Sequence, residues 1–112
     1  MKLKTREQSD VMIVELSGKI MGGPESVQFH DTIKQAIGAN RKRVVIDLGE
    51  VEWMNSSGIG LLVSAYTTLK NAGCDLKLAR TTDKIQSLLV ITKLNSVFDS
   101  HSSVDGAIQS FN

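Results

Sequence analysis

The 112-residue sequence predicts an α/β fold, a mixed sheet of four or five strands packed with about four helices. Short apolar, β-branched runs of strand length alternate with segments whose apolar residues recur every three or four positions. A strand–helix–strand order in the middle of the chain is typical of a crossover between parallel strands. The length and the ordinary apolar and charged content fit a single domain over residues 1–112.

The N-terminal third predicts two strands and a helix. Val11 to Leu16 is a strand pattern that Ser17-Gly18 is expected to close, and the more polar Leu3 to Gln8 predicts a paired edge strand. Gly22-Gly23-Pro24 predicts a turn into a helix, because proline suits a first helical position. The expected apolar face of this helix consists of Val27, Phe29, Ile33, Ala36 and Ile37, and the expected stop signals are Gly38 and Asn40.

The remaining elements follow from the same patterns. Arg43 to Leu48 is a continuous apolar run, which predicts a central strand covered on both faces. A helix is predicted from Ile59, Leu62, Tyr66 and Leu69, with its end before Gly73, and a strand from the alternation of Cys74, Leu76 and Leu78 with polar residues. Thr82 and Ser103 predict the starts of two further helices, and Val97-Phe98 predicts a short last strand between them.

Composition and motifs argue against several function classes. The net charge is +1 and the basic residues are scattered except at residues 41–43, so no nucleic-acid partner is expected. No apolar stretch reaches the length of a membrane span, so we expect a cytoplasmic protein without membrane insertion. The single Cys74 and the isolated His30 and His101, both expected at the surface, predict no metal site. No phosphate-binding glycine motif occurs, so no cofactor is expected.

The stretch W-M-N-S-S-G-I-G from Trp53 to Gly60 admits two interpretations. In the first, Asn55 caps a helix, and Met54 and Ile59 stand where a hydrophobic staple would form. In the second, a serine in the first turn accepts a phosphate, because a helix N-terminus favours negative charge there. A nucleophilic serine, as in a small serine hydrolase, is a remote alternative, because the stretch is not G-x-S-x-G.

The order V-V-I-D-L, V-E-W-M-N-S-S-G-I-G-L-L, helix, C-D-L-K-L-A, together with L-S-G-K-I at Leu16 to Ile20, resembles the STAS family of anti-sigma factor antagonists over essentially the whole chain. The resemblance implies a single STAS-like domain and a non-enzymatic role. It further implies that the protein binds an anti-sigma factor with serine kinase activity when unphosphorylated, and so releases a sigma factor. Phosphorylation of Ser56, with Ser57 as the alternative acceptor, would end this binding, and a phosphatase would restore it.

The chain departs from the family pattern at two positions. Asn55 stands where the family usually has an acidic residue, and Met21 stands where it commonly has an aspartate.

The expected partner surface comprises Lys19, Ile20, Met21, Gly22, Trp53, Asn55, Ser56, Ser57 and Gly58, with the turn at Arg80 to Asp83 as a possible extension. For Trp53, two interpretations remain open: an exposed anchor for a partner and a packed core residue.

The alternative function within the family is that of an unphosphorylated adaptor subunit of a lipid-transport or stress-sensing complex. Outside such complexes we expect a monomer, because Lys2, Lys4 and Arg6 protect the edge strand.

Overall fold

The computed structural model describes residues 1–111 and contains a five-stranded sheet and four helices. The strands are β1 (Lys2–Gln8), β2 (Val11–Ile20), β3 (Arg43–Met54), β4 (Asp75–Ala79) and β5 (Ser100–His101). The helices are α1 (Glu25–Gly38), α2 (Ser56–Asn71), α3 (Asp83–Ile91) and α4 (Val104–Gln109). The predicted fold class, a mixed sheet packed with helices, is therefore confirmed.

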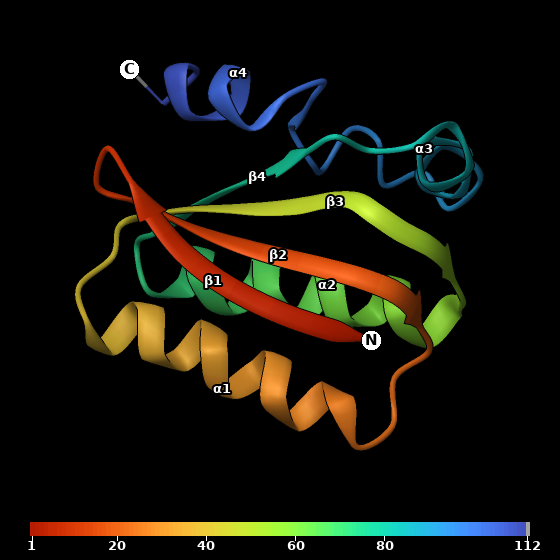
Figure 1. The fold of residues 1–112 in the computed structure, drawn as a ribbon, viewed down its shortest axis with the longest axis horizontal. Helices are drawn as coiled ribbons and strands as arrows, with labels where there is room; N and C mark the ends of the chain where they lie inside the picture. Colours follow the sequence, from red (N-terminus) through yellow and green to blue (C-terminus); the bar gives the residue numbers. More distant parts are fainter. Residues whose placement is uncertain (112) are drawn as a thin grey trace.

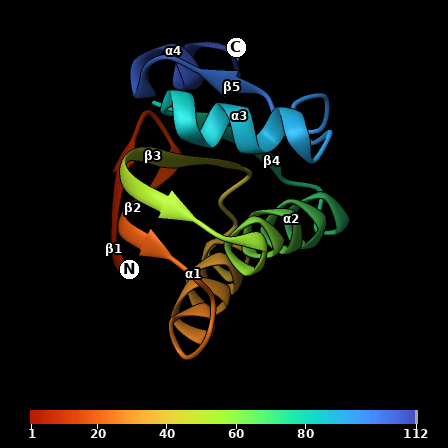
Figure 2. The same ribbon diagram turned by 90° about the vertical axis from the view of Figure 1, so that its right-hand side faces the viewer.

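The strands lie in the order β1-β2-β3-β4-β5, with β1 antiparallel to β2 and all other neighbours parallel. As predicted, β3 is central and Leu3 to Gln8 lies in an edge strand. Helices α1 and α2 cover one face of the sheet, and α4 lies on the other (Figures 1 and 2). The buried residues Ile85 and Leu89 of α3 join the same apolar cluster as α1 and α2. This layering explains the apolar run of β3, because Val44, Val45 and Ile46 alternate between two covered faces and are all fully buried.

Two apolar clusters hold the layers together. The larger one lies mainly between the sheet and helices α1 and α2, and includes Phe29, Leu62 and Leu69. The smaller one joins Val11, Ile13 and Val45 of the sheet to Val104 and Ala107 of α4. Val27 was expected in the apolar face of α1, but it is exposed, because Phe29, Ile33 and Ala36 form that face and Val27, two residues before Phe29, lies on the opposite side of the helix.

Strands β2 and β3 extend past the ends predicted for them. Ser17-Gly18 does not close β2, which continues to Ile20, and β3 continues beyond Leu48 to Met54. The register between them shifts twice, from Glu15↔Asp47 to Ser17↔Glu50 and from Gly18↔Val51 to Lys19↔Trp53, so β3 carries two extra residues. Such bulges bend a strand, and β3 curves visibly towards the start of α2 (Figure 1). Since β4 pairs only with Arg43 to Asp47, the last part of β3 is joined to β2 alone.

The C-terminal part confirms two helix starts and corrects one strand. The side chains of Thr82 and Ser103 accept hydrogen bonds from the amides of Ile85 and Gly106 at the starts of α3 and α4. Val97-Phe98 is not a strand. The last strand is Ser100–His101, which pairs with Leu78 and Ala79 of β4, while Phe98 is buried in the core from a turn. A two-residue strand is too short to show an alternating pattern, which is why periodicity placed it incorrectly.

Candidate functional site

Most of the sequence-predicted site residues lie together where β2 and β3 end. The two strands run parallel, and their register places Lys19 beside Trp53 and Ile20 beside Met54. Lys19 is exposed, Trp53 is 40% exposed, and Met21, just beyond β2, is 51% exposed. Ile20 and Met54 are buried. The side chain of Ile20, although predicted in the partner surface, is therefore not accessible to a partner. Trp53 is therefore available at the surface and is not a packed core residue.

Asn55 connects the two strand ends to the first turn of α2. Its backbone N–H donates to the carbonyl of Ile20 at 3.2 Å, and its side-chain Nδ2 donates to the carbonyl of Met21 at 3.4 Å. Its Oδ1 accepts the amide of Gly58 at 2.9 Å, which is the expected N-cap hydrogen bond. One side chain thus caps α2 and fixes the loop that follows β2.

Two glycines allow this close approach. A Cβ at Gly58 would lie 2.4 Å from the carbonyl oxygen of Ile20 and 2.6 Å from Cγ of Met54, so only glycine fits between the helix start and the strand ends. Gly22 has φ +80°, and a Cβ there would lie 3.0 Å from the Cβ of Ser57. The loop after β2 therefore packs directly against Ser57.

Ser56 and Ser57 occupy the first two positions of α2 and are both exposed. Among the residues that the structure describes, neither serine hydroxyl makes a hydrogen bond. The first turn of α2 contains no acidic residue, so the partial positive charge of the helix N-terminus is not offset by one there. Each of the two serines therefore presents an accessible hydroxyl group at a position where the helix N-terminus favours a negatively charged group.

Arg80 begins the turn that was expected as an extension of this site, but its side chain makes its hydrogen bond elsewhere. Arg80 instead reaches back to the middle of β3, where its Nε donates to the carboxylate of Asp47 at 2.8 Å and its Nη2 lies 3.7 Å from Glu50. Asp47 is 6% exposed and also accepts the amide of Gly49. The hydrogen bond to Asp47 raises the pKa of Arg80 above its usual value. Sequence patterning did not indicate this ion pair, in which Asp47 is buried and Arg80 is 42% exposed. The residue that could have indicated it is Gly49, because a glycine inside a strand often marks a close approach by another group. A Cβ at this position would lie 2.3 Å from the guanidinium carbon of Arg80.

The other polar candidates do not gather at the serine turn. His101 lies in β5 with its Nε2 3.2 Å from Asp99, His30 lies in α1, and Cys74 is buried between α2 and β4. Within residues 1–111, no group of three or more His, Cys, Asp or Glu side chains is arranged to hold a metal ion. No helix in that part of the chain combines the length and apolarity needed to cross a membrane.

Comparisons with known proteins agree with this architecture. A family model described as the STAS domain matches residues 2–107. The anti-sigma-B factor antagonist of Bacillus subtilis (strain 168) is 31% identical over 64 residues, which cover 57% of this chain and 59% of that protein. The anti-sigma-B factor antagonist of Listeria monocytogenes is 35% identical over 54 residues, 48% of this chain and 47% of that protein. The chain thus spans about half the length of the curated relatives it matches.

The crystal structure of an anti-sigma factor antagonist from Mycobacterium paratuberculosis superposes with a TM-score of 0.83 at 20% identity, over 97% of this chain and 92% of that one. At 20% identity, this superposition shows that the two proteins share a fold, and it shows nothing about function.

Proposed function

The chain belongs to the STAS domain family, and from this premise we propose that it is an anti-sigma factor antagonist controlled by phosphorylation of Ser56. In its unphosphorylated form it binds an anti-sigma factor with serine kinase activity and so frees a sigma factor. Phosphorylation of Ser56 by that kinase ends the binding, and a phosphatase restores it. The role is non-enzymatic, cytoplasmic and independent of nucleic acid, and the free protein is a monomer.

The observation that carries this proposal is the setting of the Ser56 hydroxyl. It is exposed, it makes no hydrogen bond to the residues that the structure describes, and it opens α2 beside exposed Trp53 and Met21. A kinase needs such an accessible hydroxyl, and a protein partner needs apolar anchors close to it. The curated relatives with 31% and 35% identity, both anti-sigma-B factor antagonists, support the same role.

The packing of the loop after β2 favours Ser56 over Ser57 as the acceptor. The Cβ of Ser57 lies against Gly22, whose Cβ position is only 3.0 Å away. A phosphate on Ser57 would start from the side of the helix that the loop occupies, whereas no atom of Ser56 lies within 4 Å of a Cβ placed at Gly22 or Gly23 of that loop. Ser56 is therefore the proposed phosphorylation site.

A phosphate at Ser56 would leave the protein folded and act on the partner. The N-terminus of a helix stabilises a nearby negative charge by about 0.3 to 1 kcal/mol at an exposed site. Burying an unpaired charge in an interface costs roughly 3 to 5 kcal/mol, which corresponds to a loss of affinity of about two to three and a half decades. The same modification is thus mild for the fold and severe for a complex that covers Ser56.

The proposal is tested by intact-mass spectrometry of the protein isolated from its own cells, with fragmentation to locate any phosphate. The expected result is one phosphate on Ser56, which is lost in Ser56→Ala and retained in the matched variant Ser57→Ala. Pull-down of the same variants should recover a serine kinase with unphosphorylated protein, but not with Ser56→Glu. A Ser56 that stays unmodified across growth and stress conditions would refute the switch and favour the unphosphorylated adaptor role.

A further inference from the structure

The outer edge of β1 is a free strand edge with a defined set of backbone groups. β1 is the first strand of the sheet, and no described element lies beyond it (Figure 2). Ser9 and Asp10 have φ values of 54° and 64°, which identifies a two-residue turn that closes on the pair Gln8↔Val11. A two-residue turn closes on a hydrogen-bonded pair, and such pairs alternate along an antiparallel ladder. The backbone groups of Lys2, Lys4 and Arg6 therefore also bond to β2. The backbone N–H and C=O groups of Leu3, Thr5 and Glu7 therefore point outward.

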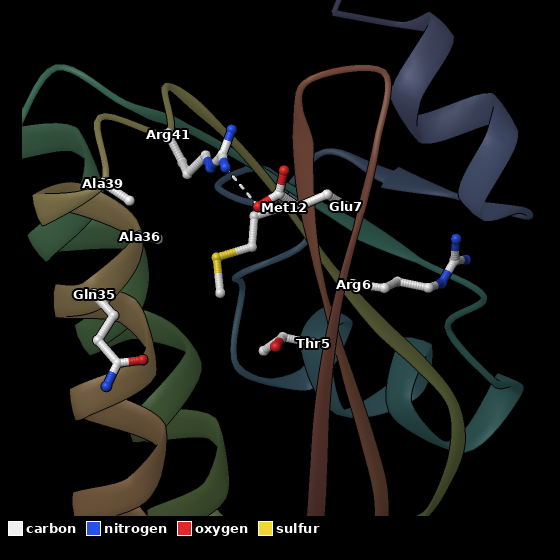
Figure 3. A pocket seen from close by; sticks show the side chains of 8 residues that line it. All are labelled: Thr5, Arg6, Glu7, Met12, Gln35, Ala36, Ala39 and Arg41. Atoms are coloured by element: carbon white, nitrogen blue, oxygen red, sulfur yellow. Dashed lines mark hydrogen bonds and ion pairs between the residues drawn. The ribbon is translucent and has the colours of Figure 1, made fainter.

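A groove runs along this edge on the side that faces α1. Its volume is about 280 Å³, and it lies between β1 with Met12 of β2 and the last turns of α1. Thr5, Glu7 and Met12 point towards α1, while Arg6 points the other way (Figure 3). The α1 side is formed by Gln35, Ala36 and Ala39, and the small alanine side chains leave the space open. An ion pair between Glu7 and Arg41 borders one end of the groove.

The other face of β1 carries a row of cations. Side chains of a strand alternate between faces, so Lys2, Lys4 and Arg6 share the face opposite the groove. Arg6 is paired with Glu15, whereas Lys2 and Lys4 have no ion pair within residues 1–111. A strand added at this edge would place every second side chain beside these cations.

The same row disfavours pairing with a second copy of the chain. In any twofold antiparallel register that matches the outward groups of Leu3, Thr5 and Glu7, even-numbered residues face even-numbered residues. A register centred on Thr5, for example, sets Lys4 against Arg6, and like charges directly opposite each other are destabilising. The edge therefore rejects itself and other basic strands, but it does not reject an acidic strand.

We propose that the outer edge of β1 binds an extended acidic segment of a partner protein as an added strand. The segment carries Glu or Asp at every second position, next to Lys2, Lys4 and Arg6, and small apolar residues between them, which enter the groove beside Thr5 and Ala36. Backbone hydrogen bonds to Leu3, Thr5 and Glu7 provide affinity, and the alternating side chains provide specificity. The groove adjoins the last turns of α1, whereas the serine turn adjoins the loop that leads into its first turn, so this site is separate from the proposed kinase surface.

The test uses ¹⁵N-labelled full-length protein and the peptide acetyl-Glu-Val-Glu-Thr-Glu-Val-Glu-amide. Amide signals of Leu3, Thr5 and Glu7 are expected to shift most and to exchange more slowly, because their N–H groups acquire partners. The control peptide has lysine in place of every glutamate and is expected not to bind. Lys4→Gln should weaken binding about two- to fivefold at low salt, the range expected for one exposed charge pair. The matched variant Lys84→Gln, at an exposed position of α3, should leave it unchanged.

Three results would overturn the proposal. The first is an absence of shifts at millimolar peptide, or shifts centred on residues 53–57. The second is equal binding of the lysine peptide, which would mean that charge does not select the strand. The third is a concentration-dependent dimer of the free protein with the same β1 amides protected, which would identify a second copy as the occupant. None of these outcomes depends on whether Ser56 is phosphorylated.

Discussion

The side chain of Asn55 accepts the amide of Gly58 at 2.9 Å, and this contact makes Asn55 both the cap of α2 and the anchor of the loop after β2. We predict that Asn55→Ala lowers the free energy of unfolding by about 1 kcal/mol, the usual cost of losing an N-cap. Asn55→Asp should stay close to the wild type, because a carboxylate can accept the same amide. Urea denaturation of the three proteins measures the difference, and an unchanged Asn55→Ala would contradict the cap.

Gly58 is predicted to tolerate no side chain. Gly58→Ala places a Cβ 2.4 Å from the Ile20 carbonyl and should destabilise the fold by about 1 to 3 kcal/mol. Gly60 is the matched control, because it lies in the same helix and a Cβ there meets nothing within 4 Å. Gly60→Ala should stabilise by about 0.5 to 1 kcal/mol through helix propensity. Thermal unfolding should therefore shift in opposite directions for the two variants.

Arg80 is predicted to stabilise the fold by pairing with buried Asp47. Arg80→Ala leaves that carboxylate with the Gly49 amide as its one hydrogen bond within residues 1–111, and should cost about 1 to 3 kcal/mol. The double variant Asp47→Asn, Arg80→Ala should recover part of this loss, because the uncompensated charge is gone. Arg6→Ala, which breaks the exposed pair with Glu15, should cost less than about 1 kcal/mol. Additive effects at Asp47 and Arg80 in denaturant titrations would argue against the pair.

Asp99 is predicted to contribute stability that acid removes. The hydrogen bond from Lys77 is the main cause that lowers the pKa of Asp99 below its usual value, and His101 lowers it further. Because the folded-state pKa is the lower one, this stability is present above the unfolded value near pH 4 and disappears as the pH falls through the folded value. Asp99 is 54% exposed, so the contribution should stay below about 1 kcal/mol.

The corresponding experiment compares the wild type and Asp99→Asn in urea between neutral and acidic pH. Their difference should be constant at neutral pH and vanish at acidic pH. Asp31→Asn, at an exposed position of α1, serves as the control for the loss of one surface carboxylate. A difference that grows on acidification would reverse the sign of the argument.

Trp53 is predicted to be a binding residue that contributes little to stability. It is 40% exposed beside Lys19 and two residues before Asn55. Trp53→Ala should weaken the proposed kinase complex by at least about tenfold, as expected for an aromatic anchor, and change stability by much less than a core substitution. Because it is the single tryptophan, its fluorescence should shift to the blue when the partner covers it. An emission spectrum that does not change on complex formation would place the interface elsewhere.

The sequence indicated the elements whose signals are local. Asn55, Thr82 and Ser103 were expected at helix starts, and each accepts an amide there, because capping depends only on neighbouring residues. The grouping of Lys19, Met21 and Trp53 also followed from the sequence, since parallel strands end at the same side of a sheet.

Features that depend on contacts between distant segments were not predictable in this way. The true ends of β2 and β3 depend on two bulges, which only the pairing of the strands reveals. The pair of Asp47 and Arg80 joins residues 33 positions apart, and neither shows a periodic signal. The exposure of Val27, by contrast, was predictable from helix periodicity, because a residue two positions before Phe29 lies on the opposite side of the helix.

The bulged extension of β2 and β3 also bears on how this protein can evolve. Lys19, Met21 and Trp53 lie on the exposed side of this two-stranded extension, whereas Asn55 and Gly58 join its end to α2 and the buried Ile20 and Met54 hold it to the core. Substitutions at these exposed positions should therefore change recognition of the proposed partner with little penalty in folding. After a gene duplication, two copies could separate their partners through these few exposed positions while both keep the same scaffold and the same proposed acceptor serine.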